Sequence, residues 1–351
     1  MAKVSSKCGK TTLREDLEQM PGKPRVYLID SEVSPISRDA VLEMEILGDA
    51  AELVFLLSKD PHSLPSDVFD ADALIVSRFP QMSQALLASF KKVQMIVRNG
   101  VGYDNIDVDA AYRLGIPVCN VPDYGTEEVA DFAILLTLAL QRKLQRALAD
   151  VRDGNWSWRA AEPGRRLRGQ RFGIIGCGRI GTATALRAKA LGFSVQFHDP
   201  YVSNGYEKAI GVGRCATLDE LLQTSDVVSL HCPLTNETRG FIGLAKLRSM
   251  KPGAFLVNTA RGPMIPEAEL IEVLRTGHLG GVALDVLDNE PVCSPELFTF
   301  PNCLITPHLA FYSADSVAEM RASAARNVLR HLQGFGPINI VNGVVPNNQQ
   351  S

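Results

Sequence analysis

The chain has 351 residues, 46% of them hydrophobic and 21% charged, with a formal net charge of −3. This composition is typical of a soluble globular protein, and the small net charge argues against a nucleic-acid or polyanion partner. No apolar run is long enough to cross a bilayer, which argues against a membrane partner.

Residues 1–24 are polar and mixed in charge, and they contain no apolar core of the kind that a secretory signal needs. Acidic residues between positions 15 and 18 argue against an organellar transit peptide. The stretch from Gly9 to Thr12 resembles the end of a phosphate loop, but Val4 stands where such a loop has its first glycine. We therefore expect a solvated polar tail.

From residue 25 to residue 122, short apolar runs alternate with helical patterns such as 82–90. Strands that alternate with helices favour a parallel sheet covered by helices on its faces. The predicted strands of this first series are 25–29, 53–57, 73–76, 93–97 and 116–119.

The segment 126–148 is predicted to be one helix of a different kind. Glu127 and Glu128 would lie in its first turn, where the helix dipole favours negative charge. Residues 129–140 are apolar nearly all round, and basic residues close the segment. A helix that is apolar on every side has to be buried, either within its domain or between subunits.

A basic stretch at 165–168, predicted to be a solvated connection, leads into a second series. Helical patterns at 180–191, 218–222 and 267–274 again alternate with apolar runs. The fold class that follows is α/β, with two Rossmann-like, doubly wound parallel-sheet domains. The predicted strands of the second series are 171–175, 195–197, 227–230, 254–257, 281–284 and 303–305.

Seven scattered cysteines contain no C-x-x-C pair. We therefore expect neither a disulfide framework nor a metal site. Several of them lie in apolar, strand-like runs, where cysteine usually acts as a small hydrophobic residue. The pattern favours a reducing compartment, and we expect the cytoplasm.

The sequence FGIIGCGRIG at 172–181 predicts a dinucleotide site. It places three glycines in the G-x-G-x-x-G pattern between an apolar strand and a helix that opens with Arg179 and Ile180. Gly176 permits the tight turn, Gly178 lets the main chain approach a pyrophosphate, and Gly181 lets helix and strand pack closely. The N–H groups at the start of the helix would bind the phosphates.

Asp199 ends the next predicted strand. A carboxylate there can accept hydrogen bonds from the adenosine ribose hydroxyls and would repel a 2′-phosphate, so NAD is favoured over NADP. The strand 227–230 runs into His231, Cys232 and Pro233, which should lie near the cofactor at the carboxyl edge of the sheet. A histidine that caps the strand end is as good an interpretation of His231 as one that contacts the cofactor.

Three later strand ends carry Arg261, the pair Asp285 and Glu290, and His308. Each residue taken singly reads as an ordinary surface, loop or packing residue. Together at one sheet edge they match what reduction of a 2-keto acid needs: a guanidinium for the carboxylate, an imidazolium to protonate the carbonyl oxygen, and a carboxylate to orient the imidazole.

The chain resembles the D-isomer-specific 2-hydroxyacid dehydrogenases from residue 25 almost to its end. Arg261, Glu290 and His308 occur in NTARG, DNEP and TPH, as in that family. The further motifs that carry the resemblance, in chain order, are RNGVGYDNID, NVP, GCGRIG, HCPLT, GAFLVNTARG and GVALDV.

The resemblance implies an NAD-dependent dehydrogenase or 2-keto acid reductase. Arg261 would bind the substrate carboxylate, His308 would be the acid/base, and Glu290 would pair with His308. Substrate contacts would also come from Asn99, Val101, Gly102 and Phe311. Cofactor contacts would come from Thr126, Gly176, Gly178, Arg179, Ile180, Gly181, Asp199, Cys232, Pro233, Thr238, Thr259, Ala260 and Asp285, the last through the nicotinamide carboxamide.

The resemblance also implies a discontinuous substrate domain. It would comprise 25–122 and the return at 309–351, with the NAD-binding Rossmann domain 123–308 inserted between them. Proteins of this family are commonly dimers that associate through the cofactor domain. The apolar segment 126–140 suits that arrangement, so a homodimer is expected.

The nearest branch is the one that contains the C-terminal-binding proteins. LAFYS after His308, DPYVSNG at 199–205 and the segment 319–326 resemble that branch, whose corepressors carry tryptophan where this chain has Phe311. Gly125 also stands where the family usually has serine. Two hypotheses follow: an enzyme that acts on a small 2-keto or 2-hydroxy acid, and an NAD(H)-sensing, corepressor-like scaffold that retains the site.

Overall fold

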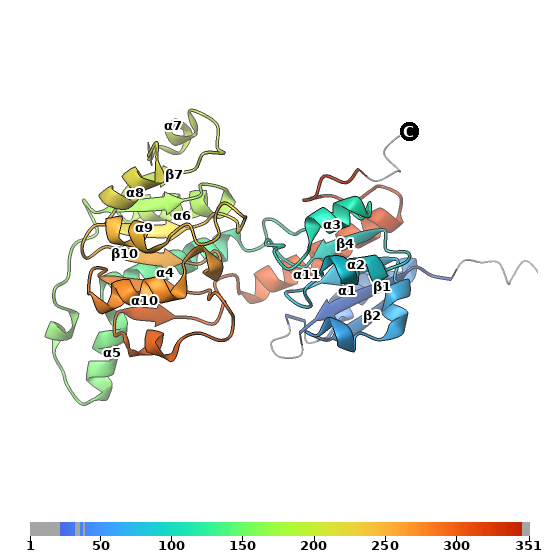
Figure 1. The fold of residues 1–351 in the computed structure, drawn as a ribbon, viewed down its shortest axis with the longest axis horizontal. Helices are drawn as coiled ribbons and strands as arrows, with labels where there is room; N and C mark the ends of the chain where they lie inside the picture. Colours follow the sequence, from blue (N-terminus) through green and yellow to red (C-terminus); the bar gives the residue numbers. More distant parts are fainter. Residues whose placement is uncertain (1–21, 32–35, 38, 346–351) are drawn as a thin grey trace, which may run out of the picture. The chain divides into compact units, whose positions relative to one another are not determined.

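The computed structural model describes residues 22–31, 36–37 and 39–345, so positions 1–21 of the predicted polar tail lie outside the described residues. The chain divides into two compact units (Figure 1). Unit 1 comprises Met1–Val121 and Arg321–Ser351, and unit 2 comprises Pro122–Met320. The predicted fold class, two parallel-sheet α/β units with one inserted into the other, is confirmed. The boundary after Met320 falls within helix α11 (Ala314–Leu332), downstream of the predicted position at His308.

Unit 1 is built on a five-stranded parallel sheet with the strand order β2-β1-β3-β4-β5. Pro117 lies in the predicted strand 116–119, but it has no N–H to donate to the ladder, and β5 begins only after it. The strands are β1 (Arg25–Asp30), β2 (Glu52–Leu57), β3 (Ala73–Val76), β4 (Met95–Arg98) and β5 (Val118–Cys119), with helices α1 (Val41–Leu47), α2 (Gln84–Ser89) and α3 (Val108–Arg113).

Unit 2 has a seven-stranded parallel sheet with the order β12-β11-β10-β9-β6-β7-β8. The chain winds outward from β6 in one direction through β7 and then crosses back to β9 on the other side. Ligands in such sheets bind at the carboxyl ends of the strands, where the order reverses. The strands are β6 (Arg171–Ile175), β7 (Ser194–His198), β8 (Gly213–Arg214), β9 (Val227–Leu230), β10 (Phe255–Asn258), β11 (Gly281–Leu284) and β12 (Cys303–Ile305); the short β8 was not predicted.

Helices cover both faces of the unit 2 sheet (Figure 1). One buried cluster joins the strands to helices α8 (Leu218–Thr224), α9 (Leu244–Ser249) and α10 (Glu267–Arg275). Apolar side chains of helices α4 (Thr126–Gln141) and α6 (Arg179–Ala190) fill two further clusters. Strands that are buried on both faces explain the nearly continuous apolar runs in the sequence. The short helix α7 (Tyr206–Ile210) lies between β7 and β8.

The predicted single helix 126–148 is wrong: it is two helices, α4 and α5 (Leu144–Arg152). The break is at Lys143, whose φ of 50° is left-handed and cannot continue a right-handed helix. The expected all-round burial is also absent within this chain. Leu135 on α4 is 52% exposed, and none of the residues of α5 is buried.

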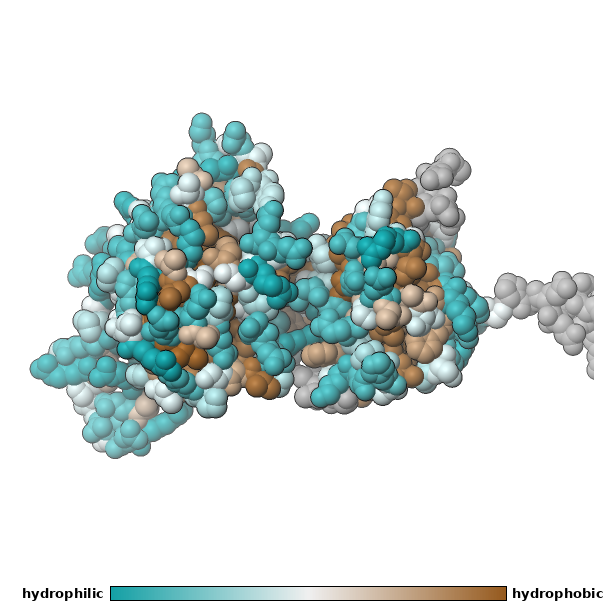
Figure 2. Space-filling model, in the orientation of Figure 1, coloured by the Kyte–Doolittle hydropathy of each residue, from teal (hydrophilic) through white to brown (hydrophobic). Residues whose placement is uncertain are grey.

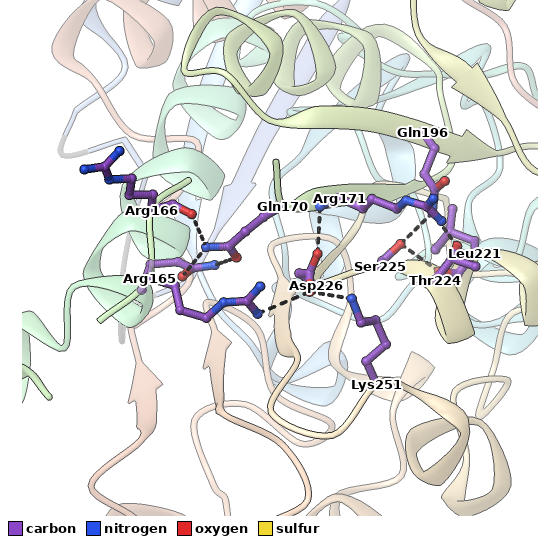
Figure 3. A network of polar contacts seen from close by, with 11 residues as sticks. Arg165, Arg166, Gln170, Arg171, Gln196, Leu221, Thr224, Ser225, Asp226 and Lys251 are labelled. Carbon is purple, nitrogen blue, oxygen red and sulfur yellow. Dashed lines mark hydrogen bonds and ion pairs between the residues drawn. The ribbon is translucent and has the colours of Figure 1, made fainter. Parts of the chain in front are cut away.

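A polar network ties the amino ends of the unit 2 strands together (Figure 3). Asp226, which precedes β9 and is 7% exposed, accepts a hydrogen bond from the main-chain N–H of Arg171 at 2.8 Å. Its other oxygen pairs with Lys251 at 2.6 Å and with Arg165 at 3.5 Å. The network lies at the amino edge of the sheet, so its charged groups are at the opposite edge from the carboxyl ends of the strands.

The visible face of the molecule carries its hydrophobic residues in small separate patches among hydrophilic ones (Figure 2). Among the helices that the structure describes, none combines the length and apolar character needed to span a membrane.

Candidate active site

The glycine-rich loop joins β6 to α6 with very little space to spare. Gly176 has a φ of +86°, and a Cβ there would come within 2.7 Å of the main-chain nitrogen of Cys232. A Cβ at Gly181 would overlap the carbonyl oxygen of Gly176. Only glycine meets both demands, because it tolerates left-handed backbone and has no side chain to collide.

At Gly178, in contrast, no described residue apart from its chain neighbours lies within 4 Å of where a Cβ would be. Gly178 is also the N-cap of α6, and no side chain caps the helix. The N–H groups of the first turn, which begins with Arg179 and Ile180, therefore face open space with the positive end of the helix dipole. This open cradle fits the pyrophosphate of a dinucleotide.

Asp199 follows β7 and is held rigidly beside this loop. One carboxylate oxygen accepts a hydrogen bond from the main-chain N–H of Cys177 at 2.7 Å, and the other accepts one from the N–H of Tyr201 at 2.8 Å. Each oxygen keeps a further lone pair, so the carboxylate can still accept a bond from a ribose hydroxyl.

The loop after β9 forms the next part of this edge. Thr238 closes it, donating to the carbonyl of Pro233 at 2.7 Å and accepting from Thr235 N–H at 2.8 Å. His231 bonds Ser229 Oγ at 2.8 Å through Nε2, while its buried Nδ1 has no hydrogen-bond partner among the described residues. Burial lowers the pKa of His231 to about 3, so its imidazole is neutral at physiological pH. Cys232 is half-buried.

Two threonine hydroxyls of unit 2, in Thr126 at the start of α4 and Thr259 after β10, are buried without a partner among the described residues. Buried hydroxyls are usually satisfied, so unpaired ones indicate sites where a ligand or water completes the bonding. Ala260 follows Thr259, and its N–H donates to Asn258 Oδ1 at 3.0 Å, which folds this loop on itself.

Arg261 is placed by two features that we did not single out from the sequence. The side-chain amide of buried Asn258 donates to the carbonyl of Arg261 at 2.8 Å. The neighbouring Gly262 packs so tightly that a Cβ would overlap the main chain of Leu287 and Asp288. The loop that carries Arg261 is thereby pressed against the loop that leads to Glu290. The signal was present, since Asn258 and Gly262 flank Arg261 within NTARG.

Asp285, at the end of β11 and 1% exposed, organises the segment that carries the histidine. One carboxylate oxygen accepts from Thr306 Oγ1 at 2.6 Å and from Leu309 N–H at 3.0 Å, and the other accepts from Ala310 N–H at 2.9 Å. Burial raises the pKa of Asp285 despite these bonds. Sequence reasoning missed Thr306 as the partner of Asp285, because nothing in ITPH indicates it.

His308 receives its position from the same segment, with its N–H bonded to the carbonyl of Asp285 at 2.8 Å. Its φ of 52° is unusual for a residue that is not glycine, and strain of this kind is concentrated at functional sites. The ring Nδ1 lies 2.8 Å from Glu290 Oε2, and Glu290 Oε1 accepts from Leu287 N–H at 3.0 Å. The His308 and Glu290 side chains are 25% and 14% exposed, so both are largely withdrawn from solvent.

Phe311 stands beside the histidine. Its ring centroid is 6.2 Å from that of His308 and 6.4 Å from that of Tyr124, both in edge-on contact. A Cβ on Gly125 would be 3.7 Å from Phe311, an ordinary contact, so the glycine at this position is not demanded by crowding.

The three predicted substrate residues Asn99, Val101 and Gly102 belong to unit 1, just after β4. Asn99 is fully buried, and neither atom of its side-chain amide has a partner among the described residues. The carbonyl of Val101 accepts a hydrogen bond from the Asn120 side chain at 2.7 Å. At this edge of the unit 1 sheet, the side-chain amide of Asn99 can therefore form further hydrogen bonds.

Comparisons with known proteins, by sequence and by structure, agree on one protein family. The model of the D-isomer specific 2-hydroxyacid dehydrogenase NAD-binding domain matches residues 134–310, all within unit 2. D-Lactate dehydrogenase from Aquifex aeolicus, solved with NAD and lactic acid, superimposes with a TM-score of 0.82 at 29% identity, covering 91% of this chain and 99% of that one.

Two curated relatives are longer than this chain. C-terminal-binding protein 1 of Caenorhabditis elegans is 37% identical over 325 residues, which are 90% of this chain and 44% of the relative. D-3-phosphoglycerate dehydrogenase of Mycobacterium bovis is 36% identical over 302 residues, 85% of this chain and 57% of the relative. The chain thus spans about half the length of the curated relatives it matches.

Proposed function

Because this chain belongs to the D-isomer-specific 2-hydroxyacid dehydrogenase family, we propose that it transfers a hydride between NAD and C2 of a D-2-hydroxy acid or 2-keto acid. The observation that carries the proposal is the 2.8 Å hydrogen bond between His308 Nδ1 and Glu290 Oε2, on a segment held by Asp285. In the proposed mechanism this bond orients the imidazole, and Nε2 of His308 exchanges a proton with the substrate oxygen.

We assign NAD to unit 2. Gly176, Gly178 and Gly181 would hold the pyrophosphate together with Arg179 and Ile180, on the open cradle at the start of α6. Asp199 would bind the ribose. The remaining contacts would come from Thr126, Cys232, Pro233, Thr238, Thr259, Ala260 and Asp285. Bound NAD supplies the group that gives or accepts the hydride.

In the direction of reduction, Arg261 binds the substrate carboxylate, which its planar guanidinium can grip through two hydrogen bonds. His308 gives the proton on Nε2 to the keto oxygen as that oxygen gains negative charge. Glu290 accepts the hydrogen bond from Nδ1–H, which fixes the ring and stabilises its charged form before transfer. In the direction of oxidation, His308 takes the hydroxyl proton.

Phe311 would form an apolar wall beside the reacting histidine, as its edge contact with His308 supports. In unit 1 we assign substrate binding to Asn99, Val101 and Gly102. The buried amide of Asn99, without a partner among the described residues, supports a polar ligand there.

The test is oxidation of NADH by the purified chain with a panel of 2-keto acids from glyoxylate to aromatic acids. Turnover with at least one acid is expected, with the rate of His308→Gln lower by about two orders of magnitude or more, as loss of a general acid typically gives. Turnover of His308→Gln close to that of the wild type would remove His308 from the mechanism.

The similarity to C-terminal-binding protein 1 favours a second candidate, an NAD(H)-sensing scaffold of the corepressor type. The same panel separates the two functions. Tight NAD binding without turnover of any acid would favour the scaffold and contradict the enzyme.

We assign a homodimer contact to the arm formed by residues 142–170. Trp156 is 92% exposed and Trp158 72%, and Leu144, Leu148 and Val151 along α5 are also about half exposed. Exposed apolar groups gathered on one segment are typical of protein interfaces. Sedimentation of the wild type should give the mass of a dimer. The double variant Trp156→Ser with Trp158→Ser should have a lower mass, whereas the control Phe298→Ser, which removes another exposed aromatic side chain, should not. A monomeric wild type would contradict the assignment.

A further inference from the structure

The loop that follows Asp199 is fixed in place although it lies on the surface. The guanidinium of Arg214 donates to the carbonyls of Val202 and Ser203 at 3.0 and 2.9 Å. At the end of the loop, the hydroxyl of Tyr206 lies 2.7 Å from Thr182 Oγ1 on α6. Contacts from two different elements therefore hold the loop in a defined conformation.

Tyr201 lies in the middle of this loop and contacts two carboxylates. Its main-chain N–H donates to Asp199 Oδ1 at 2.8 Å. Its side chain is 80% exposed, yet the hydroxyl donates to Glu237 Oε2 at 2.6 Å, and this contact raises the pKa of Tyr201. Glu237 belongs to the loop after β9, which Thr238 closes. One tyrosine thus joins the two loops that follow β7 and β9.

The consequence is a pair of negative charges close to the proposed ribose site. Asp199 and Glu237 lie at the two ends of a single tyrosine. Arg214 of β8, which holds the first loop, is engaged by Glu207 at 3.3 Å as well as by the loop carbonyls. Arg239 is exposed and forms no ion pair with either acid among the described residues. Among the described residues, the hydrogen-bond partners of Asp199 and Glu237 are main-chain N–H groups and the Tyr201 hydroxyl, and neither acid forms an ion pair.

We propose that Glu237, oriented by Tyr201, is a second determinant of cofactor choice that acts with Asp199 against the 2′-phosphate of NADP. A 2′-phosphate brings about two negative charges, and like charges repel even across a solvent-exposed, partly screened gap. Glu237 does not have to touch the ribose for this effect, which acts through space. The inference rests on the proposed NAD site of unit 2.

The experiment measures binding by calorimetry and needs no turnover. The full-length protein is titrated with 5′-AMP and, separately, with adenosine 2′,5′-bisphosphate, which differs by the 2′-phosphate alone. The quantity compared is the ratio of the two dissociation constants. The variants are Glu237→Gln and Tyr201→Phe. The control is Glu272→Gln on α10, which Figure 1 shows well separated from α7 and β7 in unit 2.

Glu237→Gln is expected to lower the preference for AMP about three- to tenfold, the size expected for one exposed charge across a partly screened gap. Tyr201→Phe lowers it by a smaller factor, because Glu237 keeps its charge but loses its anchor. Both effects shrink towards none in about 1 M salt, where screening is strong. A purely structural contribution would not respond to salt in this way. The control leaves the ratio unchanged.

An unchanged ratio in Glu237→Gln, with normal AMP binding, would overturn the role of Glu237 and leave the proposed function standing. A lower ratio in Glu237→Gln but not in Tyr201→Phe would refute the orienting role of Tyr201. Failure of the wild type to bind AMP would contradict the NAD site itself, and this inference with it.

Discussion

Replacement of Glu290 by glutamine tests the pairing that the proposed mechanism needs. Glutamine keeps the size of the side chain but has one oxygen and one NH₂ group. The hydrogen bonds that matter here are those that Glu290 accepts from Leu287 N–H at 3.0 Å and from His308 Nδ1 at 2.8 Å. The variant can satisfy only one of them, and it places a donor against the other.

The magnitude follows from the distance between the two charges. At 2.8 Å, Coulomb's law gives about 6 kcal/mol at an effective dielectric constant of ~20 and about 1.5 kcal/mol at ~80. The side chains are 25% and 14% exposed, so an intermediate value of about 3 kcal/mol is appropriate. If this stabilises the protonated histidine, its loss lowers the rate of keto acid reduction about 100-fold.

The assay is the steady-state rate of NADH oxidation with an accepted keto acid, between about pH 5 and pH 9. Loss of the carboxylate should also move the pH at which reduction declines downward by about two units, since one pH unit corresponds to ~1.4 kcal/mol. Glu267→Gln is the matched control, because Glu267 also accepts a main-chain N–H, that of Ser294, without contact to the histidine. A rate within about threefold of the wild type, with an unshifted pH profile, would refute the reasoning.

Gly262→Ala should destabilise the fold by about 1–3 kcal/mol and lower turnover about 100-fold, because its Cβ displaces the main chain of Leu287. The control Gly164→Ala, at an exposed position, should change neither the melting temperature nor the rate. Asp199→Ala should raise the affinity for NADP relative to NAD about tenfold. An NADP-to-NAD affinity ratio in calorimetry equal to that of the wild type would contradict the ribose role of Asp199. His231 is neutral in the fold and charges on unfolding below pH 6.5, so stability falls as pH falls from 6.5 towards 3. Between pH 6.5 and pH 5, the free energy of unfolding measured with urea should fall by about 2 kcal/mol less in His231→Gln than in the wild type. Equal decreases in the two proteins would argue against the burial of His231.

Local patterns in the sequence were enough for the two α/β units and for the candidate residues at the sheet edge. Apolar runs of strand length, separated by helical periods, predict parallel sheets because each strand has to be buried on both faces. In a parallel sheet the carboxyl ends share one edge, so residues such as Glu290 and His308, far apart in the chain, were expected near each other. The glycine pattern at 176–181 is informative because its reasons are backbone conformation and close packing.

Only the tertiary structure revealed how those residues are held. The break at Lys143 depends on one backbone angle that apolar periodicity does not encode. The sequence predicts a cofactor role for Asp285, and only the structure shows that its oxygens also bind Thr306, Leu309 and Ala310 after the neighbouring strand. Periodicity reports which side of an element is buried, whereas these contacts depend on the exact positions of side chains brought together across the sheet, and that information exists only after the chain has packed.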